Sequence, residues 1–345
     1  AADLSDDRVQ ICVPADFEMP TGGLNAQWPT TPLEQEKLLH RYRIYAARAF
    51  AHANNLNRVT LDSPNPRLGI VTSGKSHLDV LEALRDLGID RETATRIGLR
   101  IYKVGMSWPL EPIATHEFAR GLTEILVVEE QRSVIEDQIT GQLYNWPVAE
   151  RPRVVGEFDE HGNHLVSNLS ELTPGQVARA IGARVLKFHD SPKIRERLEF
   201  LDAKEARLDR YPPPMVRTPY FCSGCPHNTS TRIPEGSIGH AGIGCHYMVR
   251  WMDRSTEFFT QMGGEGASWI GQAPFTDTPH TFQNIGDGTY FHSGILAIRA
   301  AVASGVNITV RILNNDAVAM TGGQAVDGSL TLDQIVAQVR AEGVE

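Results

Sequence analysis

The chain has 345 residues, 41% of them hydrophobic, and a formal net charge of −9. This length predicts two or three domains with a sizeable core, and an acidic chain without a basic run argues against nucleic-acid binding. The sequence shows no secretory signal and no apolar stretch of membrane-spanning length, so we expect a cytoplasmic protein that binds no membrane and keeps its 4 cysteines reduced.

Residues 1–65 are predicted to form a connecting segment with one helix. Proline and glycine are scattered through residues 1–32, which show little periodicity. The next residues carry the start signal of a helix: Thr31 can cap it, Pro32 suits its first turn, and Glu34 completes a capping box. The helix is expected to end near Asn54.

Residues 66–147 alternate between apolar strands and amphipathic helices. The expected strands lie at 68–72, 100–104 and 124–129, and the expected helices at 77–87, 111–121 and 133–144. Three strands with helices on both faces predict a small parallel sheet, which makes the fold class α/β.

Within this domain, residues 69–76 match the Gly-x4-Gly-Lys-Ser pattern of a nucleotide-binding loop. Such a loop needs a strand before its first glycine and flexible backbone between the two glycines. Here the residues between the glycines form the predicted strand itself. We therefore expect a strand-to-helix turn, with Ser76 as the helix cap, in place of a nucleotide site.

Residues 148–215 are predicted to link two domains. Polar residues at 159–163 favour a short hairpin, and 171–184 and 191–211 favour helices. The run Pro212-Pro213-Pro214 is a stiff stop, which places the boundary of the last domain, 216–345. We expect this last domain to contain a second parallel sheet.

The strongest functional signal is Gly286-Asp287-Gly288 followed by Asn314-Asn315, each at the end of an expected strand. Residues 289–304 favour a crossover helix between the two strands. Because the carboxyl ends of parallel strands meet at one edge of a sheet, Asp287 and Asn315 can hold a common ion. One carboxylate, one amide oxygen and a backbone carbonyl suit Mg²⁺ bound to a diphosphate, and the flanking glycines let phosphate approach the backbone.

Three of the cysteines, Cys222, Cys225 and Cys245, form a second group of candidate ligands. Thiolates select iron–sulfur clusters or zinc. A zinc site with mixed ligands is an alternative because histidines lie nearby in the sequence, namely His227, His240 and His246. Packed, unpaired thiols are a third interpretation.

Several segments of the sequence resemble indolepyruvate ferredoxin oxidoreductase, in particular its long fused bacterial form. They are residues 221–227, 242–246, 261–266, 286–294 and 315–324, with weaker matches at 17–20 and 128–131. Ala325 stands where we expect proline, a change that leaves the expected metal ligands untouched. The chain starts without methionine and stops 30 residues after Asn315, so we expect a segment of a longer polypeptide.

The resemblance implies a transketolase carboxyl-terminal-like domain at 66–147 and an incomplete thiamine-diphosphate-binding domain at 216–345. Mg²⁺ would be held by Asp287, Asn315 and the backbone oxygen of Ala317. Other cofactor contacts would come from glycines, a threonine, two methionines and a histidine, namely Gly263, Gly264, Gly286, Gly288, Thr289, Met262, Met320 and His292. An ordinary core or structural role is the alternative for Met262, Met320 and His292.

The resemblance also implies oxidative decarboxylation of aryl pyruvates such as indolepyruvate, with coenzyme A accepting the acyl group and ferredoxin the electrons. Cys222, Cys225 and Cys245 would be three ligands of a 4Fe–4S cluster. The fourth ligand is not identified because Cys12 is too remote in sequence, so we expect the cluster to be incomplete in this segment.

The glutamate that activates thiamine would belong to a pyrimidine-binding domain in the rest of the parent polypeptide, so we expect this segment to be inactive alone. The parent enzyme is expected to be a homo-oligomer. Two further classes stay open. One is a non-oxidative thiamine-dependent decarboxylase, and the other is a zinc-stabilised binding module without catalysis.

Overall fold

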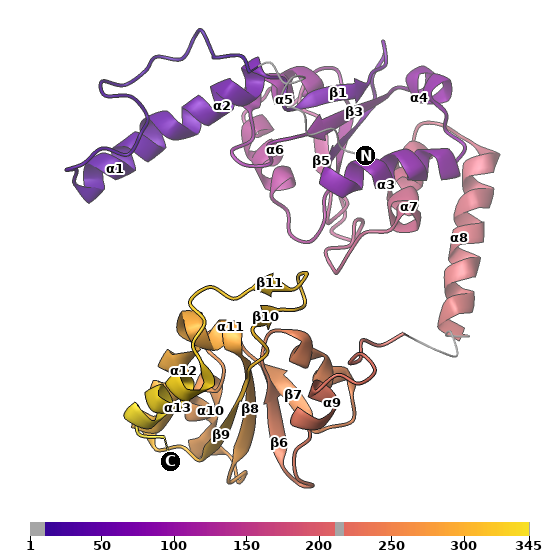
Figure 1. Ribbon diagram of the computed structural model, residues 1–345. Coiled ribbons are helices and arrows are strands. Elements are labelled where there is room, and N and C mark those ends of the chain that lie inside the picture. The colour runs from indigo at the N-terminus through magenta and orange to yellow at the C-terminus, as the bar shows by residue number, and fades with distance from the viewer. Residues whose placement is uncertain (1–10, 211–216, 345) are drawn as a thin grey trace. The chain divides into compact units, whose positions relative to one another are not determined.

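The computed structural model describes residues 11–210 and 217–344 and divides into two compact units (Figure 1). Unit 1 is Ala1–Pro212 and unit 2 is Pro213–Glu345. Each unit holds its own mainly parallel sheet with helices packed against it, so the predicted α/β class with two parallel-sheet domains is confirmed. The predicted Pro212–Pro214 boundary lies within residues 211–216, outside the described residues.

Unit 1 contains five strands and a series of helices before and between them. Its strands are β1 (Arg58–Leu61), β2 (Leu68–Ser73), β3 (Leu99–Val104), β4 (Glu124–Val128) and β5 (Arg153–Val155). Its helices are α1 (Pro32–Leu38), the π-helical turn η2 (Leu39–Arg43), α2 (Ile44–Ala53), α3 (Gly74–Asp86), α4 (Arg91–Ile97), α5 (Pro112–Ala119), α6 (Ile135–Leu143), α7 (Pro174–Val185) and α8 (Pro192–Arg210).

The unit 1 sheet has the order β1-β3-β2-β4-β5, in which β1 is antiparallel to β3 and the other neighbours are parallel. The three predicted strands are β2, β3 and β4. Alternate residues of the central strands face opposite layers, as strand geometry requires. Ile70 packs with helices α3 and α7 in one core cluster, while Val71 packs with α5 and α6 in the other.

Residues 11–210 lie in one compact unit, a range in which the sequence predicts three parts with boundaries after residues 65 and 147. In the expected linker, β5 pairs in parallel with β4, with Leu126 opposite Val155. Val177 and Ile181 of α7 are buried in the same cluster as the strands. The expected hairpin is present inside this unit, with the amide of Asp159 donating to the carbonyl of Asn163 at 2.9 Å.

The Gly-x4-Gly-Lys-Ser segment forms β2 and the start of α3, as expected from its apolar centre. The Lys75 Nζ donates to Asp79 Oδ2 and to the carbonyl of Leu172, both at 2.7 Å, and lies 3.4 Å from Glu130 Oε1. The expectation that Ser76 caps the helix is wrong. Helix α3 begins at Gly74, and Ser76 is buried within its first turn.

Unit 2 has a four-stranded sheet, a small hairpin and several short helices. Its strands are β6 (Ile238–Ala241), β7 (Thr256–Phe259), β8 (Thr281–Gly286), β9 (Ile308–Leu313), β10 (Ala317–Val318) and β11 (Gln324–Ala325). Its helices are α9 (His227–Ser230), η3 (Cys245–Trp251), α10 (Ala267–Gln272), η4 (Ala273–Phe275), α11 (Asp287–Thr289), the π-helical turn η5 (Tyr290–Gly294), α12 (Ile295–Ser304) and α13 (Leu332–Ala341).

The unit 2 sheet has the order β7-β6-β8-β9, and all its neighbouring strands are parallel. Gly286 is paired with Leu313 at the carboxyl ends of β8 and β9. From Asp287 the chain is helical as far as Ser304, so Asp287 begins the crossover helix and β8 ends one residue earlier. Ile285, Ile298 and Ile335 form the core that joins this sheet to α12 and α13.

Among the described residues, no helix has both the length and the apolar character that crossing a membrane requires.

Candidate functional site

The carboxyl ends of the four unit 2 strands open onto a cavity of about 310 Å³. Residues that follow β6, β7, β8 and β9 all contribute to its walls. Nine of the eleven residues predicted to bind cofactor line it, namely Met262, Gly286, Asp287, Gly288, Thr289, His292, Asn315, Ala317 and Met320. Gly263 and Gly264 do not, and of the predicted cluster ligands only Cys245 does.

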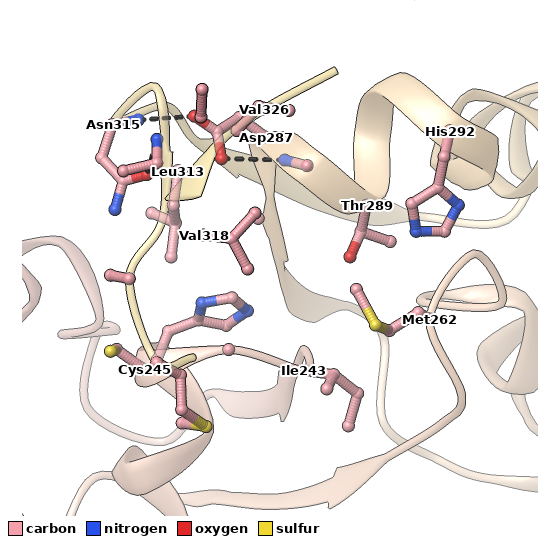
Figure 2. A pocket seen from close by; sticks show the side chains of 18 of the residues that line it. Ile243, Cys245, Met262, Asp287, Thr289, His292, Leu313, Asn315, Val318 and Val326 are labelled. Carbon is pink, nitrogen blue, oxygen red and sulfur yellow. Dashed lines mark hydrogen bonds between the residues drawn. The ribbon is translucent and has the colours of Figure 1, made fainter. Parts of the chain in front are cut away.

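Asp287 and Asn315 lie side by side at this sheet edge (Figure 2). The Asp287 carboxylate is buried, and its Oδ2 accepts hydrogen bonds from the amides of Asn315 at 2.8 Å and Asp316 at 2.7 Å. Its Oδ1 accepts from the amide of Gly288 at 2.8 Å. One carboxylate therefore fastens the loop after β9 to the helix after β8, which brings the two predicted Mg²⁺ ligands together.

The residues after Asp287 begin a helical segment, and Thr289 in this segment is buried beside the cavity. Its hydroxyl is buried and has no hydrogen-bond partner among the described residues, and its side chain lines the cavity. A buried hydroxyl without a partner is costly, which makes it a ready contact for an oxygen of a bound group. Backbone amides at a helix start also favour an anion.

His246 lines the cavity opposite the Asp287 helix and was not predicted to touch a cofactor. Its side chain is buried among three glycines, since a Cβ atom at Gly242, Gly244 or Gly286 would come within 2.5, 2.8 or 3.3 Å of the ring. Burial lowers the pKa of His246 to about 4, helped by the charge of His227 and opposed by that of Asp287. The imidazole is therefore neutral at physiological pH.

His292 and Met262 line another side of the cavity, with Ile243 beside Met262 (Figure 2). His292 Nδ1 lies 2.6 Å from Ser293 Oγ, which holds the ring by a short hydrogen bond. Gly263 has a φ of +91°, and a Cβ atom there would lie 2.1 Å from Ser293 Oγ. Gly263 does not line the cavity, so its role is structural. The positive φ of the turn and the close contact with Ser293 both require a glycine at this position.

The three clustered cysteines are close enough to interact electrostatically. Burial raises the pKa of the Cys245 thiol, and the charges of Cys225 and Cys222 raise it further. However, among residues 11–210 and 217–344 no three His, Cys, Asp or Glu side chains are arranged to hold a metal ion. The structure therefore does not bring the predicted cluster ligands into a ligating geometry, and we assign no chemical step to a cluster.

Several lining residues were not predicted from the sequence as cofactor contacts. Val318 and Val326 come from the hairpin of β10 and β11, which is too short to predict, and Ile243 follows β6. The glycines around position 243 could have indicated close packing, but they did not identify His246 as the side chain they surround.

The donor set fits Mg²⁺ and a diphosphate. It offers one carboxylate, an amide side chain on the adjoining loop, a free hydroxyl at Thr289 and a helix start, all at one end of the cavity. Mg²⁺ prefers such oxygen ligands and usually takes only one or two carboxylates from the protein.

Comparison with known proteins gives two family matches. Residues 57–211 match the indolepyruvate ferredoxin oxidoreductase middle domain, and residues 242–338 match the C-terminal TPP-binding domain of thiamine pyrophosphate enzymes. The first match spans most of the expected linker, in agreement with its place in unit 1.

Two curated relatives are both named indolepyruvate oxidoreductase subunit IorA. The Thermococcus kodakarensis protein is 28% identical over 282 residues, covering 76% of this chain and 40% of the relative. The Methanothermobacter thermautotrophicus protein is 26% identical over 337 residues, covering 90% of this chain and 49% of the relative. The chain thus spans less than half the length of these relatives.

A solved 2-oxoglutarate:ferredoxin oxidoreductase from Magnetococcus marinus aligns with a TM-score of 0.31 and 16% identity, over 49% of this chain and 26% of that one. At this TM-score the alignment supports no structural conclusion, and the family matches rest on the sequence.

Proposed function

Because this chain belongs to the indolepyruvate ferredoxin oxidoreductase family, we propose that the unit 2 cavity binds thiamine diphosphate together with Mg²⁺. The observation that carries the proposal is the meeting of Asp287 and Asn315 at the carboxyl edge of one parallel sheet. Residues 242–338, which match the TPP-binding domain, contain nearly every lining residue of the cavity.

In this proposal, Asp287, Asn315 and the carbonyl of Ala317 ligate Mg²⁺. The Thr289 hydroxyl and the amides at the start of the helix bind the diphosphate oxygens. Met262, Ile243 and Val318 exclude water around the rings, and His292 and His246 present nitrogen atoms to the remaining space. When bound, thiamine diphosphate supplies the carbon nucleophile and electron sink that decarboxylation of a 2-oxo acid needs.

The neutral state of His246 is relevant to this role. An imidazole whose pKa is about 4 stays uncharged near neutral pH, so it hydrogen-bonds a ligand without adding a cation to the site. His246 then adds no positive charge beside the diphosphate. His292 is held by Ser293 through Nδ1, which directs its other nitrogen away from Ser293.

For the parent enzyme we propose oxidative decarboxylation of a 2-oxo acid, with aryl pyruvates such as indolepyruvate as substrates, coenzyme A as acyl acceptor and ferredoxin as electron acceptor. The relatives' printed names support the indolepyruvate assignment. Metal analysis of the anaerobically prepared parent enzyme separates the alternatives. Bound iron fits the oxidative reaction, absence of iron fits the non-oxidative decarboxylase, and stoichiometric zinc fits the binding module.

Titration calorimetry with thiamine diphosphate tests the site in this chain, with Mg²⁺ or with a chelator present. We expect binding only with Mg²⁺, and loss of that binding in Asp287→Asn. Asparagine keeps one acceptor oxygen, which can serve the loop amides, but its NH2 group replaces the oxygen that accepts from Gly288, so the variant removes the charge and one hydrogen bond. Asp277→Ala, at an exposed aspartate before β8, is the control and should bind like wild type. Equal affinity in the Asp287 variant would remove Asp287 as a ligand.

A further inference from the structure

Glu265 is a buried carboxyl beside the cavity that the binding scheme above does not use. It is 1% exposed and lies in the turn between β7 and α10. Its Oε2 accepts a hydrogen bond from the amide of Gly263 at 2.6 Å. Its Oε1 is buried and has no partner among the described residues. A side chain this polar is costly to bury, so its position calls for a functional reason.

The carboxyl joins two segments that wall the cavity. The amide of Gly263 belongs to the turn that carries Met262, and the amide of Ile243, on the loop after β6, also acts on the carboxyl. Met262 and Ile243 both line the cavity. We propose that Glu265 is a positioning residue of the thiamine pocket, because its buried carboxyl holds the amide of Gly263 and so fixes the turn after β7 that carries Met262. This inference rests on the function proposed above.

The same turn also supports His292. Gly263 packs so closely on Ser293 that a Cβ atom at Gly263 would reach within 2.1 Å of Ser293 Oγ. That oxygen holds His292 Nδ1 at 2.6 Å. Fixing Gly263 through Glu265 therefore also fixes the hydroxyl that orients His292. Two lining residues on separate segments, Met262 and His292, are therefore positioned by one carboxyl.

The buried position of Glu265 favours the protonated form of its carboxyl. Burial raises the pKa of Glu265, and this shift is opposed but not reversed by backbone amides and by the charge of His292. The amides belong to Glu265 itself, to Gly263 on the turn after β7 and to Ile243 on the loop after β6, while His292 lies on η5. In the acid form Oε2 accepts from Gly263, and Oε1 carries a proton that it can donate to a bound group or water.

The direction of the pH dependence follows from this shift. A group whose pKa is raised on folding stabilises the folded site at low pH, and that contribution is lost as pH rises through the raised value. Above it, the carboxyl is ionised and still accepts from the backbone amides, but burying its charge is unfavourable, so the folded pocket is less stable and the cofactor is held less tightly. The wild-type affinity for thiamine diphosphate should therefore fall as pH rises from the ordinary glutamate range toward neutrality and beyond.

Titration of the 345-residue chain with thiamine diphosphate and Mg²⁺, from about pH 5 to about pH 9, tests the inference with Glu265→Gln and Glu265→Ala. Glutamine keeps both an acceptor for Gly263 and a donor, but cannot ionise. We expect Glu265→Gln to match wild type at low pH and to lose the pH-dependent fall in affinity that Glu265 causes. Glu265→Ala should bind about tenfold more weakly at all pH values, since it leaves the Gly263 amide unpaired.

A second buried glutamate gives the matched control. Glu111 of unit 1 is also 1% exposed and accepts hydrogen bonds from the amides of Ile113 and Ala114. Glu111→Gln and Glu111→Ala should leave the cofactor affinity and its pH profile unchanged, even if they lower the stability of unit 1.

The outcomes separate the two proposals. Absence of thiamine diphosphate binding in wild type would overturn the proposed function and this inference together. Normal Mg²⁺-dependent binding in wild type, with the same affinity and pH profile in both Glu265 variants, would overturn the inference alone. If Glu265→Gln bound thiamine diphosphate more weakly than wild type at low pH, the inference would also be overturned, because the amide can make the same contacts as the protonated carboxyl.

Discussion

The two parallel sheets of this chain end in very different ways. At the carboxyl edge of the unit 1 sheet, charged side chains are paired. Lys75 is bound by Asp79 and Glu130, and Glu129 accepts hydrogen bonds from the amides that begin α6. At the equivalent edge of unit 2, three buried polar atoms in or beside the cavity have no partner among the described residues, namely Thr289 Oγ1, His246 Nε2 and Glu265 Oε1. In unit 1, Asn57 Nδ2, beside the carboxyl end of β3, is one such atom.

The difference shows how one topology serves two purposes. Unpaired buried polar atoms each cost about 1–3 kcal/mol, so a protein retains them where a ligand or water supplies the partner. Unit 1 uses its strand ends to hold its own helices, and a segment that matches a nucleotide loop becomes ordinary packing there. Unit 2 leaves its strand ends open around a cavity. Substitutions in the two units should therefore have separable effects on folding and on binding.

The largest separable effect is expected from deleting core side chains. Leu126 of β4 and Ile285 of β8 are both fully buried, and they belong to different core clusters. Leu126→Ala and Ile285→Ala should each destabilise their own unit by about 2–5 kcal/mol. When urea unfolding is monitored by hydrogen exchange, the loss of stability should appear only in the unit that carries the substitution. Only Ile285→Ala should weaken thiamine diphosphate binding, and weakened binding in Leu126→Ala would contradict the separation.

Two buried threonines give a smaller and sharper contrast. Thr115 Oγ1 in unit 1 donates to the carbonyl of Glu111 at 2.6 Å, whereas the Thr289 hydroxyl has no partner in the part of the chain that the structure describes. Thr115→Val should lower the unfolding free energy by about 1 kcal/mol and leave binding unchanged. Thr289→Val should bind thiamine diphosphate about tenfold more weakly and unfold like wild type. Calorimetric titration and denaturant unfolding measure both quantities, and a Thr289 variant that loses stability but keeps its affinity would contradict this assignment.

The cysteines test whether unit 2 holds a second cofactor. In the parent enzyme, prepared anaerobically with iron and sulfide, we expect the bound iron to fall by at least about half in Cys225→Ser, because one thiolate ligand is lost. Cys12→Ser is the control, since Cys12 is exposed and lies in unit 1. Iron analysis gives the result. Equal iron in both variants would remove Cys225 as a ligand.

The smallest effect is expected at Lys75. Its ammonium group already binds Asp79 and the Leu172 carbonyl, so it is not available to a phosphate. We expect neither wild type nor Lys75→Ala to bind ATP, and thiamine diphosphate affinity to be the same in both. Equilibrium dialysis with labelled ATP measures this. Binding in wild type that disappears in the variant would restore the nucleotide-loop interpretation of residues 69–76.

Local signals in the sequence predicted much of this structure. The capping box at Thr31 and Glu34 forms as expected, and the apolar runs at β2, β3 and β4 lie where their pattern indicates. Asp287 and Asn315 could be placed together because the geometry of a strand–helix–strand unit fixes where two strand ends meet. Their pairing required no knowledge of the rest of the chain.

What the sequence could not reveal depends on tertiary contacts. Residues 148–210 of the expected linker lie in unit 1, where the three-residue strand β5 pairs with β4, and so short a strand has no periodic signal. Ser76 has the chemistry of a helix cap, but the helix starts earlier and buries it. The places of His246 and Glu265 arise from loops that pack on each other, so no local pattern identifies them.

The most direct test of the central claim is a crystal structure of the chain with thiamine diphosphate and Mn²⁺ in place of Mg²⁺, because Mn²⁺ accepts similar oxygen ligands and scatters anomalously. We predict one anomalous peak about 2.1 Å from oxygen atoms of Asp287 and Asn315, with the diphosphate completing its coordination. A diphosphate bound elsewhere, or a metal that touches neither side chain, would contradict the account.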